Sequence, residues 1–267
     1  MKVLKSYQLC ARSTPLRTVE RSMPRIVING TELNFRLALF DLDGTLVDDE
    51  DRYKSLAALR FAAIVRRAGS RAADTWASLG GYDPVQRSLD MSGPIAKASR
   101  REDMAIAAAA IYTSCRNWQE ARTLADAAYT EADTIQIKRY TPIIYPGVEV
   151  SLQRIKSAGF VLGIVTNGLS RITEEMLTLL KIRRIFTVVV GSEDAPNPKP
   201  APDLILTACK KARIPPSDTV YIGDQSIDAA AAEAAGCRAT VIVGKAEFSL
   251  SPRVYRVDSV AAIDAHP

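Results

Sequence analysis

The chain has 267 residues, enough for one large domain or two smaller ones. Hydrophobic residues make up 47% and charged residues 24%, a balance that is typical of globular proteins and excludes general disorder. The formal net charge of +5 comes from residues 1–36, which hold seven basic and two acidic side chains, whereas the rest of the chain has 28 of each. Because the excess lies in one short arm, neither a nucleic-acid surface nor a membrane surface is indicated.

Residues 1–35 are predicted to form a basic N-terminal extension. This arm is rich in Arg, Ser and Thr and poor in acids, which is typical of organellar transit peptides, and it lacks the apolar stretch of a secretory signal. We expect a solvated extension, and a targeting role stays open. No segment approaches the roughly 18 apolar residues of a membrane span. The four cysteines are scattered, so we predict reduced thiols in a cytoplasmic protein.

The first regular elements are expected just after the arm. The apolar residues 26–28 and the segment 33–35, with Leu33 and Phe35, flank the turn-forming pair Asn29-Gly30, which predicts a hairpin. Residues 37–40 (LALF) form a wholly apolar run that ends at the acidic segment 41–45 (DLDGT). An apolar run of this kind suits the centre of a parallel sheet, where helices cover both faces.

The middle of the chain, residues 49–144, is rich in Ala and Arg and contains no convincing strand. It is predicted to form a separate all-helical cap domain. Helices are expected over residues 53–68, 102–111 and 118–132, separated by Gly- and Pro-containing breaks.

From residue 145 onward the pattern alternates between apolar runs and amphipathic segments. Strands are expected at 161–165, 187–190, 220–222, 240–243 and 254–257, with helices between them and a short helix at 260–263. Repeated strand–helix units predict an α/β fold, a Rossmann-like doubly wound parallel sheet built from residues 36–48 and 145–267.

Several polar residues directly follow these apolar strands, where ligands bind in open parallel sheets. Four carboxylates are among them, and each taken alone is also compatible with a turn or a helix N-cap. Together they are hard oxygen ligands that suit Mg²⁺, and a cation would relieve their mutual repulsion. The predicted metal-site residues are Asp41, Asp43, Asp224 and Asp228.

Two further segments complement the acids. Thr166-Asn167-Gly168 places a hydroxyl, an amide and a flexible backbone where a strand enters a helix, which suits phosphate binding. Lys199 lies between prolines that restrict its reach, and its ammonium can offset the charge of a phosphate and of an attacking carboxylate.

Four motifs occur in one order: DLDGTLVD at 41–48, VTNG at 165–168, KPAPD at 199–203 and GDQSID at 223–228. In residues and spacing they resemble the haloacid dehalogenase superfamily, over about residues 37–263. The helical insertion after the first motif resembles that of phosphoglycolate phosphatases. One departure is Gln225, where many members of the family carry Ser.

The resemblance implies a mechanism. Asp41 would be the nucleophile that forms an aspartyl-phosphate, and Asp43 would serve as general acid and then general base. Mg²⁺ would be held by Asp41, the main-chain carbonyl of Asp43, Asp224 and Asp228. Thr166 and the adjacent amides would hold the phosphoryl group, and Lys199 would neutralise charge.

Within the superfamily, Asp43 favours phosphate over halide chemistry, because the dehalogenases lack that second aspartate. Sugar phosphomutases keep it but use a hinge histidine, and the sole histidine here is His266, which we expect in a solvated tail. We therefore predict a phosphatase that acts on small phosphorylated metabolites. A phosphomutase or a catalytically inactive binding protein stays open.

The break before the second cap helix holds three basic residues that can reach a second anionic group on the substrate: Lys97, Arg100 and Arg101. Exposed helix-start charges are the alternative interpretation. No feature of the sequence indicates an oligomeric state.

Overall fold

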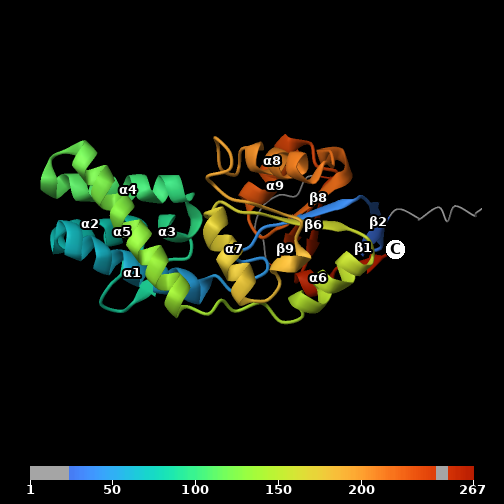
Figure 1. Cartoon of the computed structure of the whole chain (residues 1–267), viewed down its shortest axis with the longest axis horizontal. Helices are drawn as coiled ribbons and strands as arrows, with labels where there is room; N and C mark the ends of the chain where they lie inside the picture. Colours follow the sequence, from blue (N-terminus) through green and yellow to red (C-terminus); the bar gives the residue numbers. More distant parts are fainter. Residues whose placement is uncertain (1–23, 245–251) are drawn as a thin grey trace, which may run out of the picture.

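A computed structural model describes residues 24–244 and 252–267. Its centre is a six-stranded, wholly parallel sheet with the strand order β10-β9-β8-β3-β6-β7 (Figure 1). The strands are β3 (Leu37–Phe40), β6 (Val161–Val165), β7 (Val188–Val190), β8 (Thr219–Gly223), β9 (Ala239–Val243) and β10 (Val254–Val257). The predicted Rossmann-like α/β fold is confirmed.

Both faces of the sheet are covered by helices, which explains why its strands are mainly apolar. In β3, Ala38 and Phe40 join a core with α6 (Val148–Ser157) and α7 (Ser170–Leu179). Leu37 and Leu39 join a second core on the other face, with α8 (Asp203–Ala212) and α9 (Ser226–Ala235). Figure 1 shows α8 and α9 above the sheet and α6 below it.

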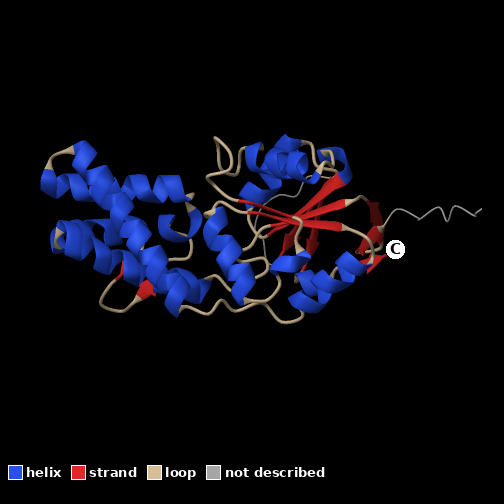
Figure 2. Cartoon of the chain, in the orientation of Figure 1, coloured by secondary structure: helices blue, strands red, loops and turns tan. Residues whose placement is uncertain are grey.

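A small antiparallel sheet lies at the end of the core farthest from the helical insertion (Figure 2). It has the order β11-β1-β2, with β1 (Arg25–Ile28) and β2 (Thr31–Asn34) as the predicted hairpin and β11 (Asp264–His266) on the other side. Ile26 and Ile28 are buried in the same core as β3. The prediction of an extension over residues 1–35 is therefore wrong from residue 24 onward, because the hairpin buries its apolar face. Residues 1–23, with Cys10 and most of the basic arm, lie outside the described residues.

The expectation that His266 belongs to a solvated tail is also wrong in part. His266 pairs with Arg25 in the antiparallel register, and its side chain is half-buried beside Asp264, with 3.1 Å between Nε2 and Oδ2. A strand of three residues has too little periodicity to be recognised in the sequence.

The inserted segment forms a helical unit at the side of the sheet (Figure 2). Its helices are α1 (Glu50–Ala68), α2 (Ser70–Gly80), α3 (Pro94–Lys97), α4 (Arg100–Cys115) and α5 (Trp118–Arg139). They share a hydrophobic core of their own, rich in alanine, with Trp76 and Tyr129 at its centre. Three features were not expected: the helix α2, the short helix α3, and the two-residue strands β4 (Tyr82–Asp83) and β5 (Ser88–Leu89), which form a small hairpin where no strand was predicted.

A buried polar network crosses the interior of this helical unit. The indole of Trp76 donates to the Tyr129 hydroxyl at 3.0 Å, which donates to Asp103 at 2.7 Å, and Arg60 donates to the other oxygen of Asp103 at 2.5 Å. Both oxygens of Asp103 accept hydrogen bonds, so burial of its charge is compensated, whereas Nε of Arg60 is buried without a partner among the described residues. We propose that residues 49–144 are the cap domain and that residues 36–48 and 145–267 are the catalytic core. Within the described ranges, no helix is long and apolar enough to cross a membrane.

Candidate active site

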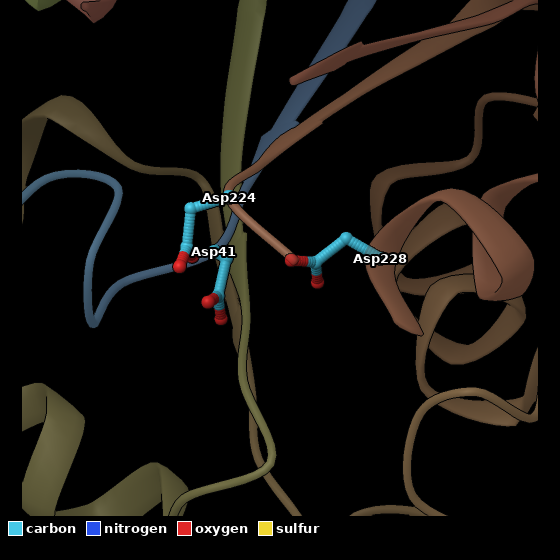
Figure 3. Close-up of side chains that lie close together, drawn as sticks. All are labelled: Asp41, Asp224 and Asp228. Carbon is cyan, nitrogen blue, oxygen red and sulfur yellow. The ribbon is translucent and has the colours of Figure 1, made fainter. Parts of the chain in front are cut away.

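Three carboxylates converge at the carboxyl end of the parallel sheet (Figure 3). Asp41 directly follows β3, Asp224 follows the neighbouring strand β8, and Asp228 lies in the first turn of α9. One oxygen from each lies within 4.8 Å of the others, although up to 187 positions separate these residues in the chain. The parallel pairing of β3 with β8 brings the strand ends together, as expected for this class of sheet.

Lys199 is the cation of this group. Its ammonium donates to Asp41 at 2.9 Å, to Asp228 at 2.6 Å and to the Tyr221 hydroxyl at 2.9 Å. The side chain is almost fully buried, so these contacts are shielded from water. Burial alone would lower the pKa of Lys199, but the carboxylates of Asp228 and Asp41 outweigh it and hold the pKa well above its ordinary value.

Asn167 fixes the backbone from which Lys199 projects. Its side-chain amide donates to the Lys199 carbonyl at 3.0 Å, and its oxygen accepts from the Lys199 main-chain N–H at 2.8 Å. The side chain of Asn167 thus positions the lysine loop, and its predicted role in phosphate binding stays a prediction. Gly168 likewise donates its main-chain N–H to the Thr166 hydroxyl at 3.0 Å.

The backbone approaches the acids closely at two glycines. A Cβ at Gly44, where φ is +76°, would lie 2.6 Å from Oδ2 of Asp224, and a Cβ at Gly223 would lie 2.5 Å from the Asp228 carboxyl. The Thr45 hydroxyl donates to Asp224 at 3.1 Å from the same turn. Glycine is therefore required at position 44 both by the left-handed backbone and by the packed carboxylate.

Negative charge exceeds positive charge in this cluster, since three carboxylates surround one ammonium. Burial raises the pKa of Asp41 well above its usual range, and the charges of Asp228 and Asp224 add to that effect against Lys199. Burial also raises the pKa of Asp224 to about 7, again with Asp228 contributing. The excess charge and the convergent hard oxygens suit a divalent cation such as Mg²⁺, so the residues present fit the predicted metal.

Asp43 is the residue whose surroundings differ most from expectation. Its side chain points to the first turn of α1, where Oδ2 accepts from the buried guanidinium of Arg52 and lies 3.4 Å from the Tyr53 hydroxyl. Its other oxygen, Oδ1, is buried without a hydrogen-bond partner among the described residues. The carboxyl is therefore tied to the cap helix and does not join the cluster of Asp41, Asp224 and Asp228. The predicted metal contact of Asp43 is through its main-chain carbonyl and stays a prediction.

A cavity of about 50 Å³ lies against the cluster and is lined by Asp41, Asp43, Thr166, Lys199 and Lys97, among others. The structure thus brings Lys97 to the cavity beside the acids, and its predicted contact with a substrate stays a prediction. Arg100 instead binds Asp133 at 2.6 Å, and Arg101 is exposed in an outer groove between α4, α5 and the start of α7. The three basic residues therefore do not act as one group.

Gln225 takes the N-cap position of α9, and its main-chain N–H donates to Oδ2 of Asp228 at 2.9 Å. This contact uses the backbone and does not depend on the side chain, so the departure from Ser leaves Asp228 in place.

Three residues of the site were not anticipated from the sequence: Arg52, Tyr53 and Tyr221. Tyr221 is the third residue of an apolar strand, and its hydroxyl also donates to the Val165 carbonyl at 2.9 Å. A tyrosine inside an otherwise aliphatic strand was the available signal. The sequence held no such signal for Arg52 and Tyr53, because side chains in the first turn of a helix after Asp48–Asp51 are normally solvated.

Comparison with known proteins agrees with this geometry. The family model described as haloacid dehalogenase-like hydrolase matches residues 97–242. Phosphoglycolate phosphatase 1 of Pseudomonas aeruginosa is 30% identical over 208 residues, covering 78% of this chain and 69% of the relative. Phosphoglycolate phosphatase of Escherichia coli is 29% identical over 206 residues, covering 76% and 79%. The β-phosphoglucomutase structure from Clostridium difficile superimposes with a TM-score of 0.60 at 21% identity, covering 85% and 92%.

The chain therefore belongs to the haloacid dehalogenase-like hydrolases, as its four motifs predicted. Within that family it is an enzyme of the phosphatase type, similar to phosphoglycolate phosphatases. The likeness to the mutase is one of fold.

Proposed function

We propose that this protein is a Mg²⁺-dependent phosphatase that hydrolyses small phosphate monoesters through an aspartyl-phosphate on Asp41. The observation that carries the proposal is the placement of Asp41, a buried carboxylate 2.9 Å from the Lys199 ammonium at the wall of a small cavity. The names of the relatives support a short phosphorylated acid as substrate, and 2-phosphoglycolate is the one we propose to test first.

In the first step, an oxygen of Asp41 attacks phosphorus and the bond between phosphorus and the ester oxygen breaks. Asp43 donates a proton to the departing oxygen. In the second step, Asp43 takes a proton from a water molecule that attacks the phosphorylated Asp41, which releases inorganic phosphate and restores both carboxyls.

The remaining residues bind and orient. The Thr166 hydroxyl faces the same cavity as Asp41 and would hold a phosphoryl oxygen, and Lys199 would offset the charge that gathers during attack. Mg²⁺, held by Asp41, Asp224, Asp228 and the Asp43 main-chain carbonyl, would supply charge neutralisation for the phosphoryl oxygens when bound. The cap closes the cavity and limits entry of water.

A sugar phosphomutase is the second candidate that the sequence left open. His266, the sole histidine of the chain, lies in β11 and contacts Asp264. It does not line the described cavity beside Asp41. Hydrolysis is therefore the function that the site supports best.

The test is release of phosphate from p-nitrophenyl phosphate and from 2-phosphoglycolate, with Mg²⁺ and with EDTA. Asp41→Asn should lower the rate by about 1,000-fold or more, because it removes the nucleophile. Asp74→Asn, the same change at an exposed position of α2, serves as the matched control and should keep wild-type activity.

Trapped protein should carry a phosphoryl group on the peptide that contains Asp41, as judged by mass spectrometry after an acid quench. Activity that persists in Asp41→Asn would refute the nucleophile. Interconversion of sugar phosphates without release of phosphate would favour the mutase.

A further inference from the structure

The ion pair between Arg52 and Asp43 joins the cap to the catalytic core. Arg52 is 7% exposed and Asp43 is 8% exposed, so both charges are removed from water. The guanidinium also lies over the ring of Tyr53, 4.6 Å from its centroid, and the main-chain carbonyl of Arg52 accepts from Gln136 of α5 at 2.8 Å. Arg52 is thus held from several sides with its charge directed at one carboxylate.

Neighbouring arginines have acidic partners of their own inside the cap. Arg60 binds Asp103 at 2.5 Å and Arg100 binds Asp133 at 2.6 Å. In the part of the chain that the structure describes, the one carboxylate within ion-pair distance of Arg52 is that of Asp43. Any movement of Asp43 away from this position therefore leaves a buried guanidinium that needs another anion.

A second small cavity lies at this ion pair. It has a volume of about 60 Å³, and its lining includes Asp43, Arg52, Arg60, Arg100 and Thr166. It shares Asp43, Tyr53 and Thr166 with the cavity beside Asp41 and Lys199. The two cavities therefore adjoin at these residues, which places Arg52 next to the site of a phosphoryl group at Asp41.

The chemistry of this cavity suits a carboxylate. Its volume of about 60 Å³ exceeds the roughly 15 Å³ that one water molecule needs, so it has room for a small polar group. The planar pair of oxygens of a carboxylate matches the fork of the Arg52 guanidinium that lines the cavity.

We propose that Arg52 selects substrates that carry a carboxylate next to the phosphate ester, by exchanging Asp43 for that carboxylate. In the structure Asp43 occupies the place of the substrate's second anion. When the substrate carboxylate binds Arg52, Asp43 is released and becomes free to reach the ester oxygen. An ester without a second anion leaves the Arg52–Asp43 pair in place and reacts slowly.

This inference rests on the proposed phosphatase function and assigns its selectivity to one residue. The alternative is that Arg52 only positions Asp43, in which case every substrate depends on it to the same degree. The two substrates that separate these roles are 2-phosphoglycolate and ethyl phosphate, because both have two carbon atoms and only the first has a carboxylate.

The experiment measures kcat/KM for both substrates with Mg²⁺ in the wild-type protein, Arg52→Met and Arg52→Lys. The wild-type protein should prefer 2-phosphoglycolate. In Arg52→Met the ratio of the two kcat/KM values should fall by about 10- to 100-fold, the effect of one charge-assisted hydrogen-bonded pair. Arg52→Lys keeps the charge without the fork and should give a smaller fall. Arg67→Met, on the same helix and paired with Glu131 at the surface, is the matched control and should keep the wild-type ratio.

Equal losses on both substrates in Arg52→Met would overturn the inference and leave Arg52 as a positioning residue for Asp43. A wild-type protein that hydrolyses both esters equally would overturn it alone, with the phosphatase function intact. Hydrolysis of neither ester, nor of p-nitrophenyl phosphate, would overturn the proposed function and the inference together. Thermal unfolding of each variant shows whether a loss of activity comes from misfolding. If Arg52→Met is unstable, the comparison of the two substrates in the wild-type protein and in Arg52→Lys still decides the test.

Discussion

Replacement of Lys199 by methionine tests whether one ammonium holds the acidic cluster together. The substitution keeps the length of the side chain and removes a charge that contacts Asp41 at 2.9 Å and Asp228 at 2.6 Å. Both carboxylates are buried, and Lys199 itself is 4% exposed. Loss of one partner from a buried ion pair typically lowers the free energy of unfolding by about 3–5 kcal/mol, because the remaining charge is left uncompensated. We expect a loss of this size for Lys199→Met in the metal-free protein at pH 8.

The assay is urea unfolding in EDTA, repeated at pH 5. The destabilisation should be smaller at pH 5, because burial raises the pKa of Asp41 and a protonated carboxyl needs no cation. Lys211→Met is the matched control, since Lys211 pairs with Asp194 at the surface and should contribute no more than about 1 kcal/mol. A Lys199→Met protein that is no less stable than Lys211→Met would refute the reasoning.

Two further predictions concern the metal. Gly44→Ala should raise the Mg²⁺ concentration needed for half-maximal activity by about 10-fold or more, because the new Cβ displaces the Asp224 carboxyl. Gly30→Ala is the control: it has the same backbone cost but open space around it, so it should leave the Mg²⁺ requirement unchanged. Equal Mg²⁺ requirements of the two variants would contradict the geometry. Because the pKa of Asp224 is raised to about 7, Mg²⁺ must displace a proton at pH 6, and calorimetry in two buffers should detect more proton release there than at pH 8. The raised pKa of Asp224 also means that the folded metal-free protein keeps a proton that the unfolded chain loses above about pH 4. The stability of the metal-free protein should therefore fall between about pH 4 and pH 7. A Mg²⁺ affinity that is independent of pH would contradict the raised pKa of Asp224.

The sequence alone was sufficient for the fold class and for the residues at the strand ends. Asp41 and Asp224 follow short, mainly apolar strands. This pattern is local, because it depends on a few neighbouring residues and on the rule that ligands bind beyond the carboxyl ends of parallel strands. The order of the four motifs then indicated the family, which the comparisons confirm.

The tertiary structure decided which partner each polar side chain has. Asn167 is 32 positions from Lys199 and holds its backbone, and Asp43 turns to Arg52, only nine positions away, because helix α1 starts where the chain leaves the sheet. Nothing in the local pattern distinguishes a buried arginine from a solvated one in the first turn of a helix. The pairing of β11 with β1 likewise joins the two ends of the described chain. The position of a strand of three residues depends on the strand with which it pairs. Which residue follows a strand can be read from the local sequence. The burial of its side chain and its hydrogen-bond partners depend on contacts between segments far apart in the chain.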